Sequence, residues 1–565
     1  MKILIRIICL ILSAVMIFMI NTACFKNKTN NTNTSTSNMS GTASNPDGSG
    51  YTWNTSYELD WYVGIPYYLP YDKEKAIVHK TIYDRTGLSD INFISTSDGS
   101  NDKLNAFLVA GTLPDLITLQ IGSPQVQVLQ NSGLLYPLNE LIDKYAPNFK
   151  GVVPEEAINW GRASDGNWYG MYYRTVDPEK IKNSSQSHNI GMIARQDIME
   201  LLGLKPEDFN TQDGMANALK KVKDAKLVQN EVPIIPFYCT NTIGDNIYDF
   251  VNSIAQFFGI SPEDAKGNYV EAVNHPKFFE MLQFLNRLYL EGLLIRDNFL
   301  IRKSQFNEYI MNGNVFLSIG TVLGVKDAYI QSMNNGEGKV SYIHAGPVLA
   351  KDHTEPYYPR PGMNTWLVTF VPKSAKNPDR IIQLIEYLYS VEGQLLISFG
   401  IEGVTYTWDE ENRIKWTDEV LALRETDYME MQKRYGMDTL YFIGDGVTRS
   451  SHYPRPQTEA GKIVDQIADH FHKGRVYISD AASNIYFDPS TEEAVIQAKV
   501  RLYLNEELIK VVTASSAERC TMLFREILEQ LEDIGLSKLQ DAKNDKFQEN
   551  KKKLGVEFIY PGKLH

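Results

Sequence analysis

The amino-acid sequence predicts an α/β fold made of more than one domain. Strand-like and helix-like stretches alternate over residues 57–119, and this alternation is typical of a parallel sheet with helices on its faces. Residues 51–565 are too many for one small hydrophobic core, so two or more domains are expected.

The alternation begins with a strand followed by a helix. At 57–64 apolar and acidic residues alternate, and Gly64 and Pro66 then end the run. Residues 72–86 form an amphipathic pattern, with Gly87 placed as its C-cap. The further elements of this unit are a strand at 91–94, a helix at 102–110 and a strand at 113–119.

This unit also suggests where a ligand binds. In an open parallel sheet, ligands bind beyond the carboxyl ends of the strands. In our interpretation Trp61 ends the first strand, and Asp115 lies where another strand starts. The loops after Trp61 and around Asp115 are therefore candidate walls of a binding site.

The middle of the chain is rich in helical patterns. Two short apolar runs, 233–238 and 314–320, are predicted as buried strands between the helices. Residues 492–553 predict two long helices broken near 513–518. The other predicted helices lie at 195–203, 213–226, 248–258, 276–291, 304–312 and 377–398.

The first residues predict export. Lys2 and Arg6 precede the apolar run 7–20, which has the length of a signal-peptide core and is too short to span a membrane. The small residues before Cys24 resemble a bacterial lipobox, in which the cysteine is lipidated and becomes the first residue of the mature protein. The alternative is an ordinary signal peptide or an uncleaved anchor. We therefore predict a lipoprotein signal peptide at 1–23.

A tether is predicted after the lipidated cysteine. Residues 24–50 consist largely of Asn, Thr, Ser and Gly, and such a segment has too little apolar surface to offset its ordering entropy. A lipid, a flexible tether and a folded body describe a protein anchored to the cell membrane on its extracytoplasmic face.

Charge and cysteine content narrow the possible partners. The formal net charge is −13, and Lys2 and Arg6 are lost with the signal peptide, so the mature body is acidic. Because no basic stripe is present, we expect no nucleic-acid partner. Cys239 and Cys520 lie far apart in the sequence, and neither is part of a CxxC motif. A disulfide between them is possible in an oxidising compartment, although two buried free thiols are favoured.

Several motifs occur in one order along most of the chain. They include LNAFLVAGTLPDLI at 104–117, DGNWYG at 165–170 and a helical segment at 195–204. The remaining matching segments are 133–147, 377–379, 387–394 and 399–409. Together these segments resemble the extracellular solute-binding protein family 1, in its large lipoprotein branch found with sugar importers.

The resemblance implies a type II periplasmic-binding-protein fold, in which two α/β lobes hold a ligand cleft between them. By analogy the N-lobe takes 51–175 and 356–405, and the C-lobe takes 176–355 and 406–565. A ligand that contacts both lobes closes them, and the permease subunits of an ABC transporter recognise the closed form. The implied protein is a monomer that binds a carbohydrate and uses no cofactor.

A sugar site needs aromatic plates and polar groups, because sugars present apolar C–H faces and many hydroxyls. Trp366 follows a Pro- and Gly-flanked loop that is expected to cross between the lobes. For each aromatic residue the alternative is packing in the core. The predicted ligand-binding residues are Trp61, Asp115, Tyr172, Arg174, Tyr238 and Trp366.

Catalytic and metal motifs give weaker hypotheses. The sequence has no GxSxG, HExxH, Walker A or GxGxxG run. His470 and His472 are two residues apart on a predicted helix and would point to different faces. Residues 224–233 correspond to a calcium loop of some alginate-binding relatives but lack most of its oxygen ligands. We predict no metal and no catalytic residue. The alternatives are a secreted glycosidase and a ligand-sensing partner of a membrane kinase.

Overall fold

The computed structural model describes residues 56–563 apart from short gaps. The predicted signal peptide, the predicted lipidation site Cys24 and the tether at 24–50 lie outside the described residues. Among the described helices, none is long and apolar enough to cross a membrane. The gaps are at 66–70, 96–99, 154, 164, 174–189, 240–246, 300–302, 323–325, 336–339, 347–348, 353, 360–365, 445–446, 473–475, 479, 483–484 and 556–561.

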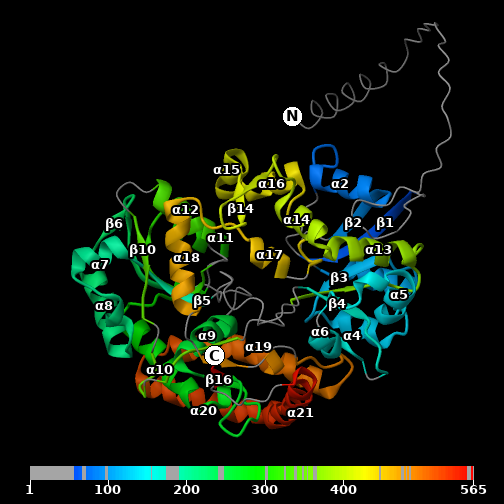
Figure 1. Ribbon diagram of the computed structural model, residues 1–565. Coiled ribbons are helices and arrows are strands. Elements are labelled where there is room, and N and C mark those ends of the chain that lie inside the picture. Colours follow the sequence, from blue (N-terminus) through cyan, green and yellow to red (C-terminus); the bar gives the residue numbers. More distant parts are fainter. Residues whose placement is uncertain are drawn as a thin grey trace, which may run out of the picture. The chain divides into compact units, whose positions relative to one another are not determined.

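The predicted strand–helix alternation forms the first sheet (Figure 1). β1 (Tyr57–Gly64) pairs in parallel with β2 (Leu88–Ser95) and with β3 (Leu116–Gln120). β12 (Leu367–Phe370) is antiparallel to β3 and to β4 (Gly170–Tyr172), which gives the order β2-β1-β3-β12-β4. The predicted parallel unit is therefore confirmed, and a strand from much later in the chain extends it.

Two helices of this unit end where glycine allows a left-handed turn. α2 (Ile77–Thr86) ends at Gly87, with φ of 65°, and α3 (Asp102–Ala110) ends at Gly111, with φ of 69°. Glycine adopts this conformation without the steric cost that a Cβ brings. Both predicted helix ends are confirmed, although α2 begins several residues later than the predicted helix at 72–86.

The second sheet has the order β10-β5-β9-β8. β9 (Val315–Thr321) is parallel to β8 (Ile235–Cys239) and antiparallel to β5 (Ile190–Arg195), which also pairs with β10 (Tyr342–His344). The two predicted buried strands are confirmed as β8 and β9, each within two residues. The helices of this region are α7 (Gln196–Leu202), α8 (Gln212–Asp224), α9 (Ile247–Ala255), α10 (Pro276–Leu290), α11 (Lys303–Met311), α12 (Lys326–Asn335) and α18 (Glu459–His472).

Buried apolar side chains form two separate cores, one on each sheet. The first core also takes in the hairpin of β13 (Tyr406–Trp408) and β14 (Ile414–Trp416), whose Trp416 ring lies 5.8 Å from that of Phe399. Residues 406–443 thus pack with the first sheet, whereas the resemblance placed 406–565 in the C-lobe. The exact division into lobes stays a prediction.

The helix predicted at 377–398 is two helices. α13 (Pro378–Tyr389) packs beside α5 (Leu138–Tyr145), and α14 (Val391–Phe399) follows it directly. The division lies at Ser390, where ψ is 160° and the hydroxyl accepts a hydrogen bond from the N–H of Gly393. A serine that caps the next helix in this way interrupts the first one.

The C-terminal segment, predicted as two helices, contains three. They are α19 (Glu492–Val512), α20 (Ala517–Ile534) and α21 (Leu536–Leu554), so the predicted break near 513–518 is confirmed. The additional break is at Gly535, which has φ of 113°. A Cβ at this position would also lie 3.1 Å from the side chain of Ile496, a tight contact that adds to the backbone preference for glycine.

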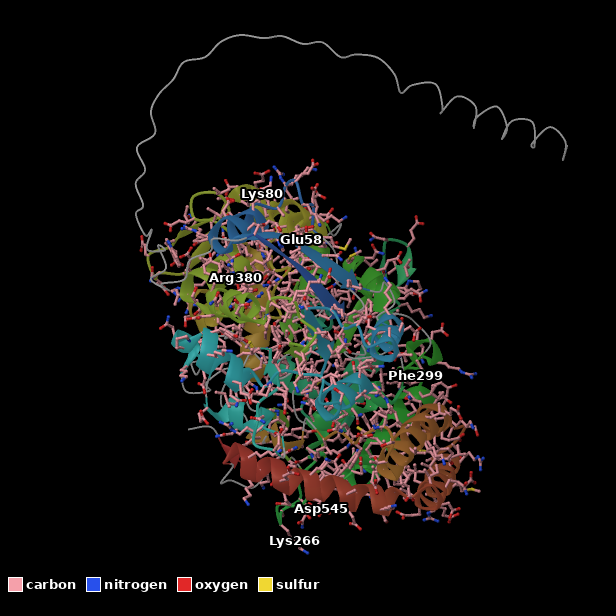
Figure 2. The ribbon with its side chains drawn as sticks, turned by 90° about the vertical axis from the view of Figure 1, so that its right-hand side faces the viewer. Glu58, Lys80, Lys266, Phe299, Arg380 and Asp545 are labelled. Atoms are coloured by element: carbon pink, nitrogen blue, oxygen red, sulfur yellow. The ribbon has the colours of Figure 1, made fainter. Side chains whose placement is uncertain are left out.

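α21 contributes side chains to both cores. Its N-terminal part packs in the second core, and Phe547 packs in the first. Lys543 and Lys551 form largely buried ion pairs with Glu271 and Glu263. Figure 2 shows Asp545 on this helix with Lys266 close by, and Gln548 hydrogen-bonds the neighbouring carbonyl of Gly267. The last helix is therefore fastened to the loop at 263–271.

One buried histidine makes stability depend on pH. His79 is 1% exposed and stacks on Tyr71 at 3.5 Å. Its Nε2 lies 2.7 Å from the hydroxyl of Thr439, which itself donates to the Gly436 carbonyl, so Nε2 carries the proton. Nδ1 is buried without a hydrogen-bond partner among the described residues. Burial lowers the pKa of His79 to about 3.

We expect this residue to destabilise the protein in acid. In the unfolded protein the pKa of this histidine is near 6.5, whereas in the folded protein it is about 3. Below about pH 6.5 the unfolded state therefore binds a proton that the folded state does not bind. The free energy of unfolding is highest above about pH 6.5 and falls below it. The loss at pH 5 is about 2 kcal/mol. Unfolding in denaturant at pH 7.5 and pH 5 measures it. His79→Gln should start less stable and lose less between the two values; an equal loss in both proteins contradicts the assignment.

Candidate functional site

The carboxyl ends of the parallel strands meet at one edge of the first sheet. β1 and β3 run side by side, with Gly64 opposite Leu119. β12 begins at this edge because Leu367 lies opposite Gln120, and β4 ends there. Open α/β sheets place their ligands beyond such an edge.

Three aromatic rings gather at this edge. Trp366 immediately precedes β12, and its carbonyl accepts a hydrogen bond from the N–H of Ile121. Tyr173 immediately follows β4, and its ring lies edge-on to Trp366 at 6.2 Å. Tyr441 stacks on Trp366 at 6.0 Å with 15° between the planes and meets Tyr173 edge-on at 5.9 Å. All three residues are half-buried. We call Trp366, Tyr173 and Tyr441 the aromatic wall.

Core residues support the aromatic wall from behind. Phe442 is buried and meets the Tyr441 ring at 5.5 Å. Trp61 meets Phe442 edge-on at 5.2 Å and stacks on Phe93 at 5.9 Å. The rings form a continuous series from the sheet face to the half-buried wall, which holds the wall in position.

The structure places Trp61 in the core. β1 continues to Gly64, so Trp61 lies inside the strand and not at its end. The side chain is fully buried, and its indole N–H donates to the Thr118 hydroxyl at 2.9 Å. Full burial leaves no ring face for a ligand in this conformation.

Asp115 lies at the opposite edge of the sheet from the aromatic wall. It precedes β3, and its carboxylate accepts hydrogen bonds from the backbone N–H groups of Asp60 at 3.0 Å and Lys376 at 2.9 Å. Only 4% of the residue is exposed. Its position and its two backbone partners suit a structural carboxylate that ties the amino-terminal edge of the sheet together.

Two predicted tyrosines are also buried. Tyr172 is 7% exposed and packs where a Cβ on Gly161 would touch its ring at 2.5 Å. Burial raises the pKa of Tyr172 to about 12, so the phenol stays neutral. Tyr238 lies in β8 with its ring 4.9 Å from Phe306 of α11, inside the second core. The structure does not bring either of them to Trp366 as a ring partner, and Arg174 lies outside the described residues.

Sequence reasoning missed Tyr173 and Tyr441. Successive side chains of a strand point to opposite faces, so the burial of Tyr172 directs its neighbour Tyr173 the other way. The alternation rule applies to the sequence, but the burial of Tyr172, which selects Tyr173, is visible only in the structure. Tyr441 has no such signal, because only folding brings it to Trp366, 75 residues earlier.

A buried charged group consists of Asp438, Arg424 and Arg449. Asp438 is its centre and lies three residues before the wall residue Tyr441. It accepts a hydrogen bond from the Tyr428 hydroxyl at 2.8 Å. Nη1 of Arg424 lies 3.3 Å from one carboxylate oxygen, and Nη1 of Arg449 lies 2.9 Å from the other. Burial by itself raises the pKa of Asp438, but the charges of Arg449 and Arg424 outweigh it and hold the pKa below its usual value.

The arginines come from separate helices. Arg424 belongs to α15 (Asp418–Thr426), and its guanidinium also lies 4.4 Å from the centre of the Trp416 ring. Arg449 belongs to α17 (Val447–His452), which follows the aromatic wall residue Tyr441. Tyr173 is among the groups that act on the charge of Arg449. The charged group and the aromatic wall therefore adjoin.

Among the described residues, no three His, Cys, Asp or Glu side chains are arranged to hold a metal ion. His470 stacks on His344 at 3.5 Å. Within 224–233, β6 (Val228–Gln229) and β7 (Val232–Pro233) form a hairpin. Cys520 carries a buried free thiol, and burial raises its pKa to about 11.

Comparison with known proteins identifies similar chains. The model of the family described as "Bacterial extracellular solute-binding protein" matches residues 86–395. The polygalacturonan/rhamnogalacturonan-binding protein YtcQ of Bacillus subtilis is 22% identical over 420 residues, which cover 73% of this chain and 79% of that protein. The fructooligosaccharide ABC transporter substrate-binding protein FusA of Streptococcus pneumoniae is 25% identical over 259 residues, which cover 43% of this chain and 46% of that protein.

Solved structures show the same fold. The structure of Streptococcus pneumoniae FusA in complex with kestose has a TM-score of 0.66 and 17% identity, and the match covers 88% of this chain and all of that one. Alginate-binding protein AlgQ2 without calcium ion has a TM-score of 0.61 and 18% identity, with 87% of this chain and 98% of that one covered. The fold expected from the sequence motifs, that of the periplasmic solute-binding proteins, is confirmed.

Proposed function

This chain belongs to the bacterial extracellular solute-binding protein family, and from that membership we propose that it captures an oligosaccharide outside the cytoplasm and delivers it to an ABC importer. The family consists of binding proteins and not of enzymes. The names of two relatives specify polygalacturonan/rhamnogalacturonan and fructooligosaccharide, which supports a carbohydrate ligand. A further relative named as a lipoprotein, LipO of Bacillus subtilis, supports anchoring through Cys24.

We assign the two cores to the two lobes of the binding protein. The N-lobe comprises 51–175 and 356–405, and the packing of 406–443 in the first core supports adding that stretch to it. The C-lobe comprises 176–355 and most of the remaining chain. In this proposal the ligand lies between the lobes and favours the closed form because it contacts both only there.

The aromatic wall is the observation that supports the proposed site most strongly. Its rings lie beyond the carboxyl ends of β1 and β3, and half-burial leaves part of each residue open. Flat aromatic faces suit the C–H faces of sugar rings, and tyrosine hydroxyls suit sugar hydroxyls. Of the predicted ligand contacts we retain Trp366 and add Tyr173 and Tyr441.

Trp366→Ala should weaken oligosaccharide binding by about ten- to hundredfold. Loss of an aromatic plate that stacks on a flat ligand costs about 1–3 kcal/mol, which corresponds to that change in affinity. The experiment first finds a ligand by thermal shift against a glycan panel and then measures affinity for parent and variant by calorimetry.

Trp408→Ala is the matched control for this experiment. Trp408 is also a half-buried tryptophan, but it lies on the β13–β14 hairpin beside Tyr406 and His452. We expect its replacement to leave the affinity within about twofold. Equal affinity in parent and Trp366→Ala would remove the wall from the site. Mass analysis of the ligand after long incubation distinguishes capture from hydrolysis, because a glycosidase would yield cleaved products.

Cys24→Ser should release the protein from the membrane. Two acyl chains supply far more membrane affinity than one, and none of the described helices is long and apolar enough to cross a membrane. Fractionation of cells that express each form, followed by immunodetection, measures the distribution. A variant that stays in the membrane fraction to the same extent as the parent would contradict lipid anchoring at Cys24.

A further inference from the structure

The charged group beside the aromatic wall holds more positive than negative charge. Asp438 faces two guanidinium groups, those of Arg424 and Arg449, with a single carboxylate. Each arginine side chain is only 16% exposed, and Asp438 is 2% exposed. One carboxylate neutralises one arginine, so the three residues carry an unbalanced positive charge away from bulk water. Such a charge is costly unless an anion accompanies it.

Further carboxyl groups lie on the Arg424 and Lys326 side of this group. The charge of Lys326 acts on Asp327 and on Asp465, and the charge of Arg424 also acts on Asp327. Among the groups that act on the charge of Arg449, Asp438 is the carboxylate, and Asp438 is shared with Arg424. The uncompensated positive charge is therefore at Arg449.

A phenol inside the group reports the sign of the local field. Burial by itself raises the pKa of Tyr453, but the charges of Arg424, Lys326 and Arg449 outweigh it, and the pKa is lowered. This net lowering in a protein with a formal charge of −13 means that the positive field is local to this part of the first core.

Arg449 lies close to the aromatic wall. It follows Tyr441 by eight residues, and the Tyr173 phenol acts on its charge. Nη1 faces Asp438, whereas the buried Nε has no hydrogen-bond partner among the described residues. The guanidinium therefore keeps donor capacity that Asp438 does not use. Arginine binds carboxylates, sulfates and phosphates through two donors at once.

We propose that the ligand is an anionic saccharide, whose ring stacks on Trp366 while its carboxylate, sulfate or phosphate group binds the guanidinium of Arg449. This inference rests on the proposed function and names the class of sugar that the same site takes. An anionic group would neutralise the excess charge beside Asp438, and the wall would hold the attached ring. A neutral oligosaccharide would leave the arginine uncompensated and bind more weakly.

The test uses oligosaccharide pairs that differ in charge alone. Oligogalacturonate, alginate and glucuronate-containing oligosaccharides are each compared with the same molecule after reduction of its carboxyl groups to alcohols. A sulfated galactan oligosaccharide and its desulfated form make a second arm, and a phosphorylated disaccharide with its dephosphorylated form makes a third. Calorimetry on the purified mature protein measures affinity at low and high salt.

We expect at least one acid to bind about ten- to hundredfold more tightly than its neutral partner, as charge-assisted hydrogen bonds predict. Added salt should weaken binding of the acid and leave the neutral partner unchanged. The arm that shows the preference identifies the anionic group.

Two variants test the role of Arg449. Arg449→Gln should abolish the preference for the acid and keep affinity for the neutral partner, whereas Arg449→Lys should keep part of the preference. Arg455→Gln is the control, because this arginine is exposed and pairs with Glu411 at the surface. An unfolding measurement shows that each variant is folded.

Each outcome decides between the two proposals. If neutral oligosaccharides bind through Trp366 and no anionic form binds more tightly, the anionic-ligand inference is wrong and the proposed function stands. If an acid is preferred equally by the parent and by Arg449→Gln, the assignment to Arg449 is wrong. If no saccharide of either charge binds, both proposals fail.

Discussion

Trp61→Ala is expected to lower the free energy of unfolding by about 3–5 kcal/mol, the usual cost of removing a large aromatic ring from a core. Trp61 is fully buried, packs between Phe93 and Phe442 and donates its indole N–H to Thr118. Removing the ring leaves a cavity between the sheet and Phe442. Equilibrium unfolding in denaturant at neutral pH measures the change.

Trp61→Phe separates the ring from its hydrogen bond. It keeps an aromatic side chain between the same neighbours, and Thr118 retains its hydroxyl partner Thr369 at 2.8 Å. We expect a smaller loss, about 1–2 kcal/mol. Because Trp61 lies behind the aromatic wall, the folded fraction of Trp61→Ala should bind more tightly than Trp366→Ala. A stable Trp61→Ala protein with a tenfold loss of affinity would instead make Trp61 a ligand contact.

Asp438→Asn should destabilise the protein by about 3–5 kcal/mol, the range for removing one partner of a buried ion pair. The substitution leaves Arg424 and Arg449 facing each other with no carboxylate between them. Asparagine is the suitable replacement because φ at this position is 57°, a conformation that asparagine tolerates. Unfolding in denaturant at pH 7 gives the difference between variant and parent.

An exposed ion pair supplies the control for Asp438. Glu419 pairs with Arg434 at 2.7 Å, and both side chains are about half exposed. Glu419→Gln should therefore change stability by less than about 1 kcal/mol. The double variant Asp438→Asn with Arg449→Gln should recover part of the loss, because it removes one of the two unpaired cations. An Asp438→Asn protein as stable as the Glu419→Gln protein would contradict the buried-charge assignment.

Local signals in the sequence account for most of the elements of the fold. The glycines at positions 87 and 111 end their helices as predicted, because a left-handed turn is a property of one residue and its neighbours. The predicted strands at 233–238 and 314–320 form because short apolar runs between helices have few other ways to be buried. The missed break at Gly535 carries the same local glycine signal, whereas the further constraint from the side chain of Ile496, 39 residues earlier, is one that no local pattern shows.

Which residues lie at the candidate site depends on tertiary contacts more than on local signals. The sequence correctly directed attention to the carboxyl ends of the strands, but the length of β1 moved Trp61 from the end of the strand into its interior. Asp115 was placed at a strand start, and a strand start belongs to the opposite edge of a parallel sheet. Trp366 lies at the edge formed by the carboxyl ends of the parallel strands because β12, from the second half of the chain, pairs antiparallel with β3.

By itself, the sequence determined the α/β class, the order of most strands and helices, and the family, because these depend on periodicity, capping residues and short motifs. The tertiary structure alone decided which aromatic rings are core and which form the wall, and it alone brought Asp438 to two arginines. Burial and charge balance are sums over neighbours contributed by distant segments. Trp61 and Trp366 have the same side chain. The neighbours that folding brings to each residue determine that Trp61 is buried behind the aromatic wall and that Trp366 is part of the wall.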